Sequence, residues 1–275
     1  SADILKYRKH VDQLMITVLG TENGREILDL LEIGLNHEEQ HQELLHMDLK
    51  SVFFTLEKDY PLKFRQKISN EKSWLEIPEG IIECGDHPEG FAFDNERPLH
   101  KSYQYKASLS QSLVSNSDYS EFIKNDGYSN PKYWLSKGWD WVNEHKITKP
   151  LYWNDSLDPL DAVAHISYFE ADAYANWMGC RLPTEFEHEY FDQVNKSPNI
   201  LWSWTSSQYS PYPGFKKFDG VLSEYNGKFM CNQFVLRGGC IATPAEHWRT
   251  SYRNFYEPEQ RWMFSGIRLA KDGHQ

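Results

Sequence analysis

The chain has 275 residues, of which 40% are hydrophobic and 15% aromatic, enough for a substantial core in one large domain or two. Its formal net charge of −11 argues against a nucleic-acid partner, because a phosphate backbone attracts a basic surface. No apolar run approaches the roughly 18 residues of a membrane-spanning helix, so no membrane partner is expected.

The cysteines favour a reducing compartment. Cys84, Cys180, Cys231 and Cys240 are widely spaced, form no CxxC pair and are too few for a disulfide scaffold. The N-terminus lacks the basic and apolar regions of a signal peptide and reads as the start of a helix. We therefore predict a cytoplasmic protein, and the absence of an initiator Met suggests a processed or truncated chain.

Helical periodicity dominates residues 2–58. A first helix ends at the break Gly20–Gly24, and a second is expected from about Arg25 to about Lys58. A two-helix hairpin cannot bury both faces alone, so it must pack on further helices or on the rest of the chain. The stripe expected to face inward on the second helix consists of Ile27, Leu30, Gly34, His37, His41, Leu44, Asp48 and Val52.

From residue 75 the segments become short and aromatic-rich, with frequent turns. Three helices are predicted there: one capped by Asn116-Ser117-Asp118 that runs to about Lys124, one from a Ser167/Glu170 capping box through Trp177, and a short one opening at Pro183-Thr184-Glu185. The fold class predicted is α+β. The domains expected are a helical hairpin (1–59), a linker (60–74) and an irregular loop-rich domain (75–275).

The strongest chemical signal is the run His37-Glu38-Glu39-Gln40-His41. Two histidines four residues apart share one face of a helix, as two ligands of one metal require. Gly34 removes bulk one turn earlier, whereas His46 lies roughly opposite His37 and is a poor third ligand. The run also matches the zinc-protease pattern HExxH with Glu38 as general base, but residues 42–75 supply no HxxGxxH extension.

Five segments of the second region carry a family resemblance: residues 76–99 (IPEGIIECGDHPEGFAFDNERPLH), 167–187 (SYFEADAYANWMGCRLPTEFE), 202–206 (WSWTS), 235–239 (VLRGG) and 264–270 (FSGIRLA). In this order they resemble the formylglycine-generating-enzyme, or sulfatase-modifying-factor, domain over about 200 residues. The resemblance implies a C-type-lectin-like fold.

The first region resembles the DinB-like helical bundle with its HxxxHxE signature, here His37, His41 and Glu43. This bundle ahead of a formylglycine-generating-type domain resembles the sulfoxide synthases of ergothioneine biosynthesis, and residues 7–12, 224–239 and 250–270 support that subfamily. The family implies an enzyme that needs Fe(II) and O2. It joins the sulfur of cysteine or γ-glutamylcysteine to the imidazole carbon of hercynine.

The resemblance also implies site residues. His37 and His41 would bind iron, Gln40 the substrate imidazole, Asn254 and Phe255 the trimethylammonium group, and Tyr225 is the candidate for proton or electron supply. From chemistry alone, Arg249 and Arg253 could bind a substrate carboxylate bidentately or could pair with acidic residues of the chain.

Two departures leave alternatives open. The synthases use three histidine ligands, and His10, the only earlier histidine here, is not in the family's position. Either a third ligand comes from a missing N-terminal segment or a separate chain, or the protein has lost the activity. The catalytic cysteine pair of formylglycine-generating enzymes is unmatched, with only Cys240 after the RGG strand. The other interpretations are a non-catalytic lectin-like binding module and a formylglycine-generating-type oxidase.

Overall fold

The computed structural model describes residues 2–21, 24, 27–65, 73–154, 156–217 and 226–273. The chain forms two compact units, Ser1–His41 and Gln42–Gln275, and their boundary falls inside helix α3 (Leu28–Thr55). The bounds 1–59, 60–74 and 75–275 remain a prediction of domain organisation. None of the described helices is long and apolar enough to cross a membrane.

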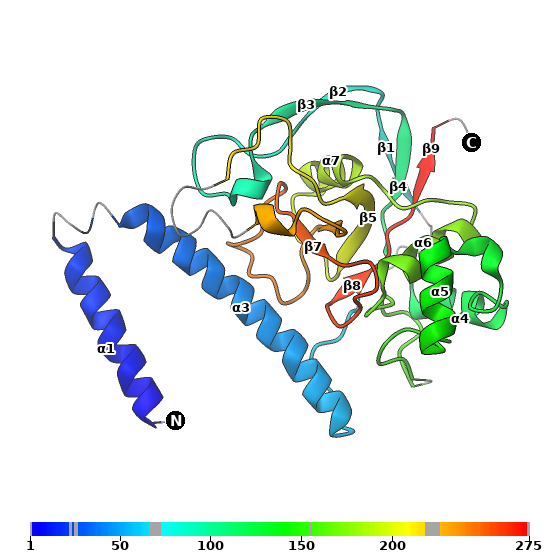
Figure 1. Ribbon diagram of the computed structural model, residues 1–275, viewed down its shortest axis with the longest axis horizontal. Helices are drawn as coiled ribbons and strands as arrows, with labels where there is room; N and C mark the ends of the chain where they lie inside the picture. The colour runs from blue at the N-terminus through cyan, green and yellow to red at the C-terminus, as the bar shows by residue number, and fades with distance from the viewer. Residues whose placement is uncertain are drawn as a thin grey trace. The chain divides into compact units, whose positions relative to one another are not determined.

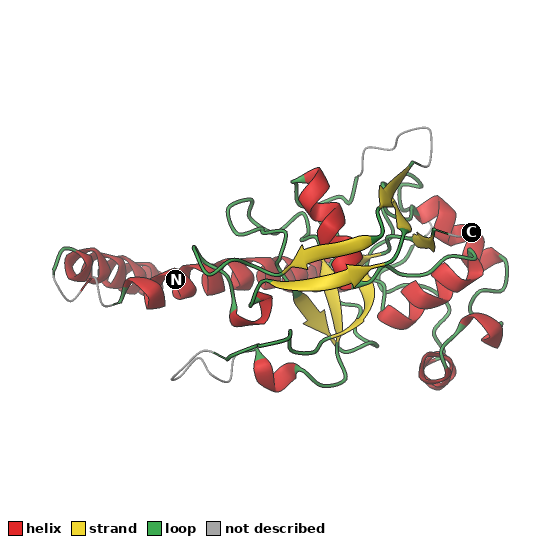
Figure 2. Ribbon diagram, turned by 90° about the horizontal axis from the view of Figure 1, so that it is seen from above, coloured by secondary structure: helices red, strands yellow, loops and turns green. Residues whose placement is uncertain are grey.

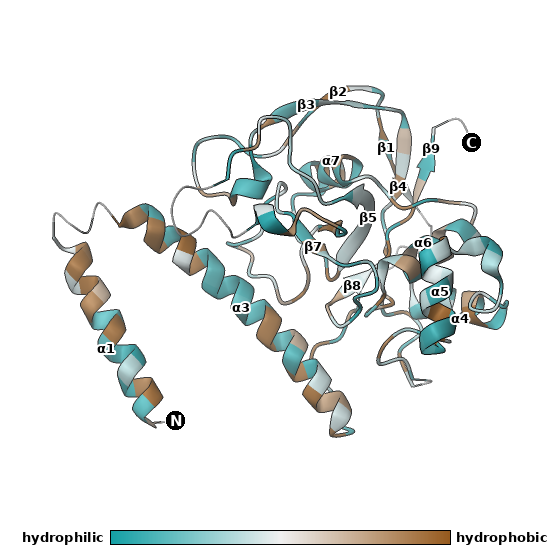
Figure 3. Cartoon of the chain, viewed as in Figure 1, coloured by the Kyte–Doolittle hydropathy of each residue, from teal (hydrophilic) through white to brown (hydrophobic). Residues whose placement is uncertain are grey.

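The first unit contains helix α1 (Ala2–Leu19) and the first half of α3. No residue of α1 is buried, and Ile4, Leu5 and Tyr7 are each about 70% exposed. Figure 3 shows hydrophobic residues all along this helix. Within the unit, both terminal guanidinium nitrogens of Arg8 lie 3.2 Å from a carboxylate oxygen of Glu38.

The second half of α3 packs in the second unit, and its buried face differs from the predicted stripe. Glu43 and Met47 are 6% and 1% exposed, whereas Val52 is 50% exposed and Asp48 is also exposed. The prediction of the inward face was therefore wrong for Asp48 and Val52, whereas Leu44 is half-buried and packs against the core as predicted. The prediction assumed that leucines and valines mark the buried face of the helix. A carboxylate can also lie on the buried face when distant segments of the chain supply hydrogen-bond partners for its oxygens.

The described residues of the second unit form three sheets, whose strands run through the middle of Figure 2. Apart from the parallel pair β5–β8, all neighbouring strands are antiparallel. The first sheet has the order β1 (Trp74–Ile77), β4 (Ala107–Ser110) and β9 (Ala270–Asp272), and the second pairs β2 (Gly80–Cys84) with β3 (His100–Gln104). The third has the order β7 (Asn254–Tyr256), β6 (Phe234–Arg237), β5 (Trp202–Gln208) and β8 (Ser265–Gly266).

The predicted helices of this unit are confirmed, with small corrections. Helix α4 (Asn116–Lys124) is capped by Ser115, one residue earlier than predicted. Helix α6 (Tyr168–Trp177) has the expected capping box, and α7 (Glu185–Asn195) has another between Thr184 and Glu187 that supports 11 residues rather than a short turn. The short 3-10 helices include η1 (Asp94–Glu96), η2 (Pro131–Tyr133) and η4 (Gly227–Phe229).

Helix α5 (Ser136–His145) was not predicted from the sequence. Its N-cap, Leu135, makes no side-chain capping bond, and Gly138 lowers its intrinsic helix propensity. A Cβ at Gly138 would lie 3.0 Å from the side chain of Phe169, so close packing on α6 favours the glycine. In Figure 1, α5 lies with α4 and α6 on one side of the second unit.

The core of the second unit is aromatic and includes the fully buried Trp202 and Trp204 of β5. A buried charge network adjoins it: Arg237 of the RGG segment donates to Glu185 at 3.2 Å and to Glu189 at 2.7 Å. Arg181 donates to both carboxylate oxygens of Glu187. The RLPTE and RGG motifs are thus architectural, and the α+β class is confirmed.

Candidate metal and substrate site

His37 and His41 occupy one face of α3, as their spacing predicts. Their Nε2 atoms lie 3.2 Å apart. Imidazole nitrogens that bind one metal at about 2.0–2.1 Å are about 3 Å apart in neighbouring coordination positions, so this spacing fits a shared ion as well as a simple hydrogen bond. Burial, and then the charge of His41, lower the pKa of His37, which favours the neutral form that a metal requires.

The described residues contain no cluster of three or more His, Cys, Asp or Glu side chains that could hold a metal. His46 is engaged elsewhere, since its Nδ1 lies 2.7 Å from the hydroxyl of Tyr60. Two histidines therefore fit part of an iron site, and a third ligand is not found in the described part of the chain.

The other polar residues of the run have different surroundings. Glu38, the general base of the zinc-protease alternative, forms an exposed ion pair with Arg8 of α1. Gln40 is half-buried and interacts with neighbours in the structure. Its contact with a substrate imidazole stays a prediction.

Glu43, the last residue of the HxxxHxE signature, connects α3 to two distant segments of the second unit. Its carboxylate accepts hydrogen bonds from Nε1 of Trp202 at 2.6 Å and from the hydroxyl of Thr243 at 2.5 Å. Burial raises the pKa of this carboxyl, which the hydrogen bonds partly oppose. Sequence reasoning recognised Glu43 only through the family signature and missed both partners, because nothing in the local pattern connects positions so far apart.

Asn254 and Phe255 lie on strand β7, and both are half-buried. The side-chain oxygen of Asn254 accepts from the backbone N–H of Phe255 at 2.9 Å. The Phe255 ring stacks on Tyr209 with ring centroids 4.0 Å apart and an angle of 8° between planes. The stack holds this ring in place, and a rigid aromatic face is what a trimethylammonium group would need.

Arg249 and Arg253 both bind carboxylates of the chain itself. Arg249 contacts both oxygens of Glu96, at 2.7 and 3.1 Å. Arg253 is 2% exposed and contacts both oxygens of Glu185, at 2.9 and 3.1 Å, as well as backbone carbonyls. The sequence left open whether these arginines bind a substrate carboxylate or pair with acidic residues of the chain. The structure supplies acidic partners for both, namely Glu96 and Glu185. Substrate binding by either arginine remains a prediction.

Tyr225 and Cys240 were also singled out from the sequence. Tyr225 lies outside the described residues. Cys240 is 1% exposed, and burial raises the pKa of its thiol, so that the thiolate is disfavoured. Together with Cys84, Cys180 and Cys231 it is a free cysteine.

Comparison with known proteins finds a family that matches part of the second unit. Residues 61–191 match the family described as "Sulfatase-modifying factor enzyme 1-like domain". This match agrees with the resemblance predicted from the RLPTE and neighbouring segments.

Individual relatives of the chain include proteins named for hercynine oxidation and ergothioneine biosynthesis. Hercynine oxygenase of Mycolicibacterium thermoresistibile is 29% identical over 253 residues, which cover 70% of this chain and 56% of that protein. Hercynine oxygenase of Mycolicibacterium smegmatis is 28% identical, covering 86% and 70%, and ergothioneine biosynthesis protein 1 of Schizosaccharomyces pombe is 27% identical, covering 66% and 28%. The chain is thus similar to the hercynine oxygenases, as predicted, and spans little more than half of the first of them.

Proposed function

We propose that the chain acts in an iron- and oxygen-dependent sulfoxide synthase that joins the sulfur of cysteine or γ-glutamylcysteine to the imidazole carbon of hercynine. The observation that carries the proposal is the 3.2 Å separation of the His37 and His41 Nε2 atoms in a chain similar to hercynine oxygenases. Bound Fe(II) would supply the place where O2 and the sulfur donor meet.

In this proposal the chain's own residues position the acceptor. Gln40 would hydrogen-bond its imidazole, and Asn254 and Phe255 would face its trimethylammonium group, which donates no hydrogen bond and prefers aromatic faces and weak acceptors. Tyr225 would supply a proton, as a phenol within reach of the reacting atoms can. Arg249 and Arg253 would bind a substrate carboxylate only by giving up bonds to Glu96 and Glu185.

The third iron ligand is proposed to come from a further segment or another chain. The free cysteines support a reducing compartment, and we propose the cytoplasm.

Anaerobic titration of the full-length protein with Fe(II), followed by oxygen-electrode measurements, tests the proposal. We expect Fe(II) to bind stoichiometrically to the protein. We expect oxygen to be consumed only when hercynine and a thiol donor are both present. Parallel assays with cysteine and γ-glutamylcysteine identify the donor. Iron uptake without oxygen consumption with either donor would overturn the proposed reaction, and no iron uptake would overturn the metal site as well.

Of the alternatives, a formylglycine-generating-type oxidase has the weaker support. Such an enzyme uses a reactive cysteine pair, whereas Cys240 is buried and its sulfur lies 3.5 Å from the Thr243 hydroxyl. A non-catalytic binding module would bind hercynine or another ligand without oxygen consumption, so the same assay separates it from the synthase.

A further inference from the structure

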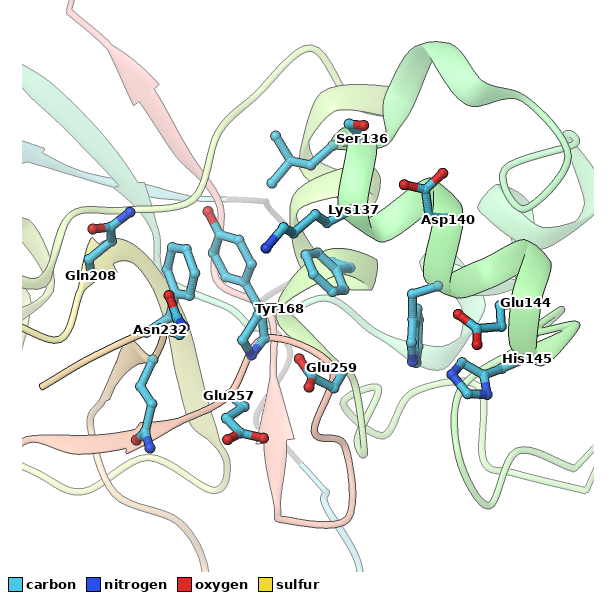
Figure 4. Close-up of a pocket in the computed structure, with 16 residues that line it drawn as sticks. Ser136, Lys137, Asp140, Glu144, His145, Tyr168, Gln208, Asn232, Glu257 and Glu259 are labelled. Atoms are coloured by element: carbon cyan, nitrogen blue, oxygen red, sulfur yellow. The ribbon is translucent and has the colours of Figure 1, made fainter. Parts of the chain in front are cut away.

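A cavity of about 800 Å³ opens beside helix α5 in the second unit. Figure 4 shows Asp140 and Glu144 on that helix, and Glu257 and Glu259 on the loop after β7. Lys137 is the one lysine among the described lining residues, so four carboxylates leave an excess of negative charge. This balance disfavours an anionic occupant.

The walls of the same cavity are aromatic. Tyr168 stacks on Phe234 with centroids 3.8 Å apart and an 18° angle between planes, and Trp141 packs against Phe169 at 5.9 Å. Trp141 already has the guanidinium of Arg261 5.3 Å from its ring centre. These faces suit the apolar body of a ligand, and their π-systems attract a cation.

Two polar atoms of the cavity lining lack partners. Tyr168 is 5% exposed, and its hydroxyl makes no hydrogen bond to any residue that the structure describes. The Oε1 atom of Gln233 is buried and is also without a hydrogen-bond partner in the described structure. The Tyr168 hydroxyl can therefore accept a hydrogen bond from a ligand with N–H donors, whereas the unpaired oxygen of Gln233 is enclosed by the protein.

We propose that this cavity binds an organic cation, an ammonium or guanidinium group with N–H donors on an apolar body. The carboxylates of Glu257 and Glu259 attract the charge, the aromatic walls contact the body, and the Tyr168 hydroxyl accepts a hydrogen bond. None of the described residues proposed for iron or hercynine lines the cavity, so this site stands independently of the proposed reaction.

Calorimetric titration of the full chain with agmatine, which carries a guanidinium and an ammonium, tests the site. Glutarate, an anion of similar length, is the matched control ligand. We expect saturable binding of agmatine that weakens as salt is added, and no binding of glutarate. A short blocked peptide with one arginine distinguishes the source: tighter binding of the peptide indicates a protein side chain, and tighter binding of agmatine indicates a free amine.

Isosteric variants locate the binding. The double variant Glu257→Gln/Glu259→Gln is expected to weaken agmatine binding about tenfold, because two charges at the rim are lost. Tyr168→Phe keeps the ring stack and is expected to weaken binding about threefold, with an unchanged unfolding midpoint. Glu89→Gln, at an exposed carboxylate outside the cavity, serves as the control. No saturation at about 10 mM agmatine, equal binding of glutarate, or unchanged affinity of the double variant would overturn the site.

Discussion

The carboxylate of Glu43 accepts a 2.6 Å hydrogen bond from Nε1 of Trp202, a residue 159 positions further along the chain. The other carboxylate oxygen accepts from Thr243, which also accepts from the backbone N–H of Cys240 at 2.9 Å. A single buried side chain of α3 thus contacts the strand of the WSWTS motif and the turn after the RGG motif. We infer that Glu43 fixes the rotation of this half of the helix.

Glu43→Ala is expected to lower the free energy of unfolding by about 2–3 kcal/mol, because the Trp202 N–H and Thr243 hydroxyl lose their buried acceptor. Urea denaturation followed by tryptophan fluorescence measures this change. Glu38→Ala is the control on the same helix, and its exposed ion pair with Arg8 contributes only about 0–1 kcal/mol. Equal effects of the two substitutions would contradict the anchoring role of Glu43.

The second prediction concerns the Fe(II) affinity of variants at the two proposed metal ligands. His37→Ala and His41→Ala should each weaken Fe(II) binding at least about tenfold, since each removes a nitrogen donor from a site with few others. Anaerobic titration with Fe(II) measures the affinity. His87→Ala, at an exposed histidine, should bind iron like the unaltered chain. Unchanged affinity in both test variants would place the iron elsewhere.

Arg253 allows its two possible roles to be separated. Arg253→Lys should destabilise the fold by about 3 kcal/mol, because an ammonium cannot reproduce the paired bonds to Glu185 and leaves a buried carboxylate poorly compensated. Chemical denaturation and steady-state oxygen consumption should be measured on the same preparation. A raised KM without loss of stability would instead assign Arg253 to the substrate.

The burial of His165 is expected to make the folding stability of the protein sensitive to acid. His165 is 3% exposed, and burial first, then the nearby charge of Lys50, lower its pKa to about 3 from an ordinary value of 6.5. The unfolded chain therefore binds a proton that the folded chain refuses, so stability is fully present above pH 6.5 and is lost as the pH falls towards 3. Between pH 6.5 and 4.5 we expect a loss of about 2–3 kcal/mol from this group.

The matched variant is His165→Asn, because His165 has a φ of 62° and asparagine tolerates this left-handed conformation. Urea midpoints measured from pH 7.5 to 4.5 should fall less steeply in the variant. Parallel pH profiles for the two proteins would show that His165 is not the group responsible.

Part of this architecture could be predicted from local pattern. The Ser167/Glu170 capping box and the Pro183-Thr184-Glu185 segment correctly located the starts of α6 and α7, because a cap and its helix are only a few residues apart. The uncapped α5, with its internal glycine, could not be predicted in this way. It depends on packing against Phe169, a residue of a later helix.

The sequence by itself determined that His37 and His41 share a helix face, because the 3.6-residue period of a helix places positions four apart together. The motifs in their order also predicted the similarity to the hercynine oxygenases. Only the tertiary structure decided that Glu43, rather than Asp48 and Val52 of the predicted stripe, faces the core, and that Arg253 is bound by Glu185. Those outcomes depend on buried polar groups finding partners far away in the chain, and the fold alone brings such partners together.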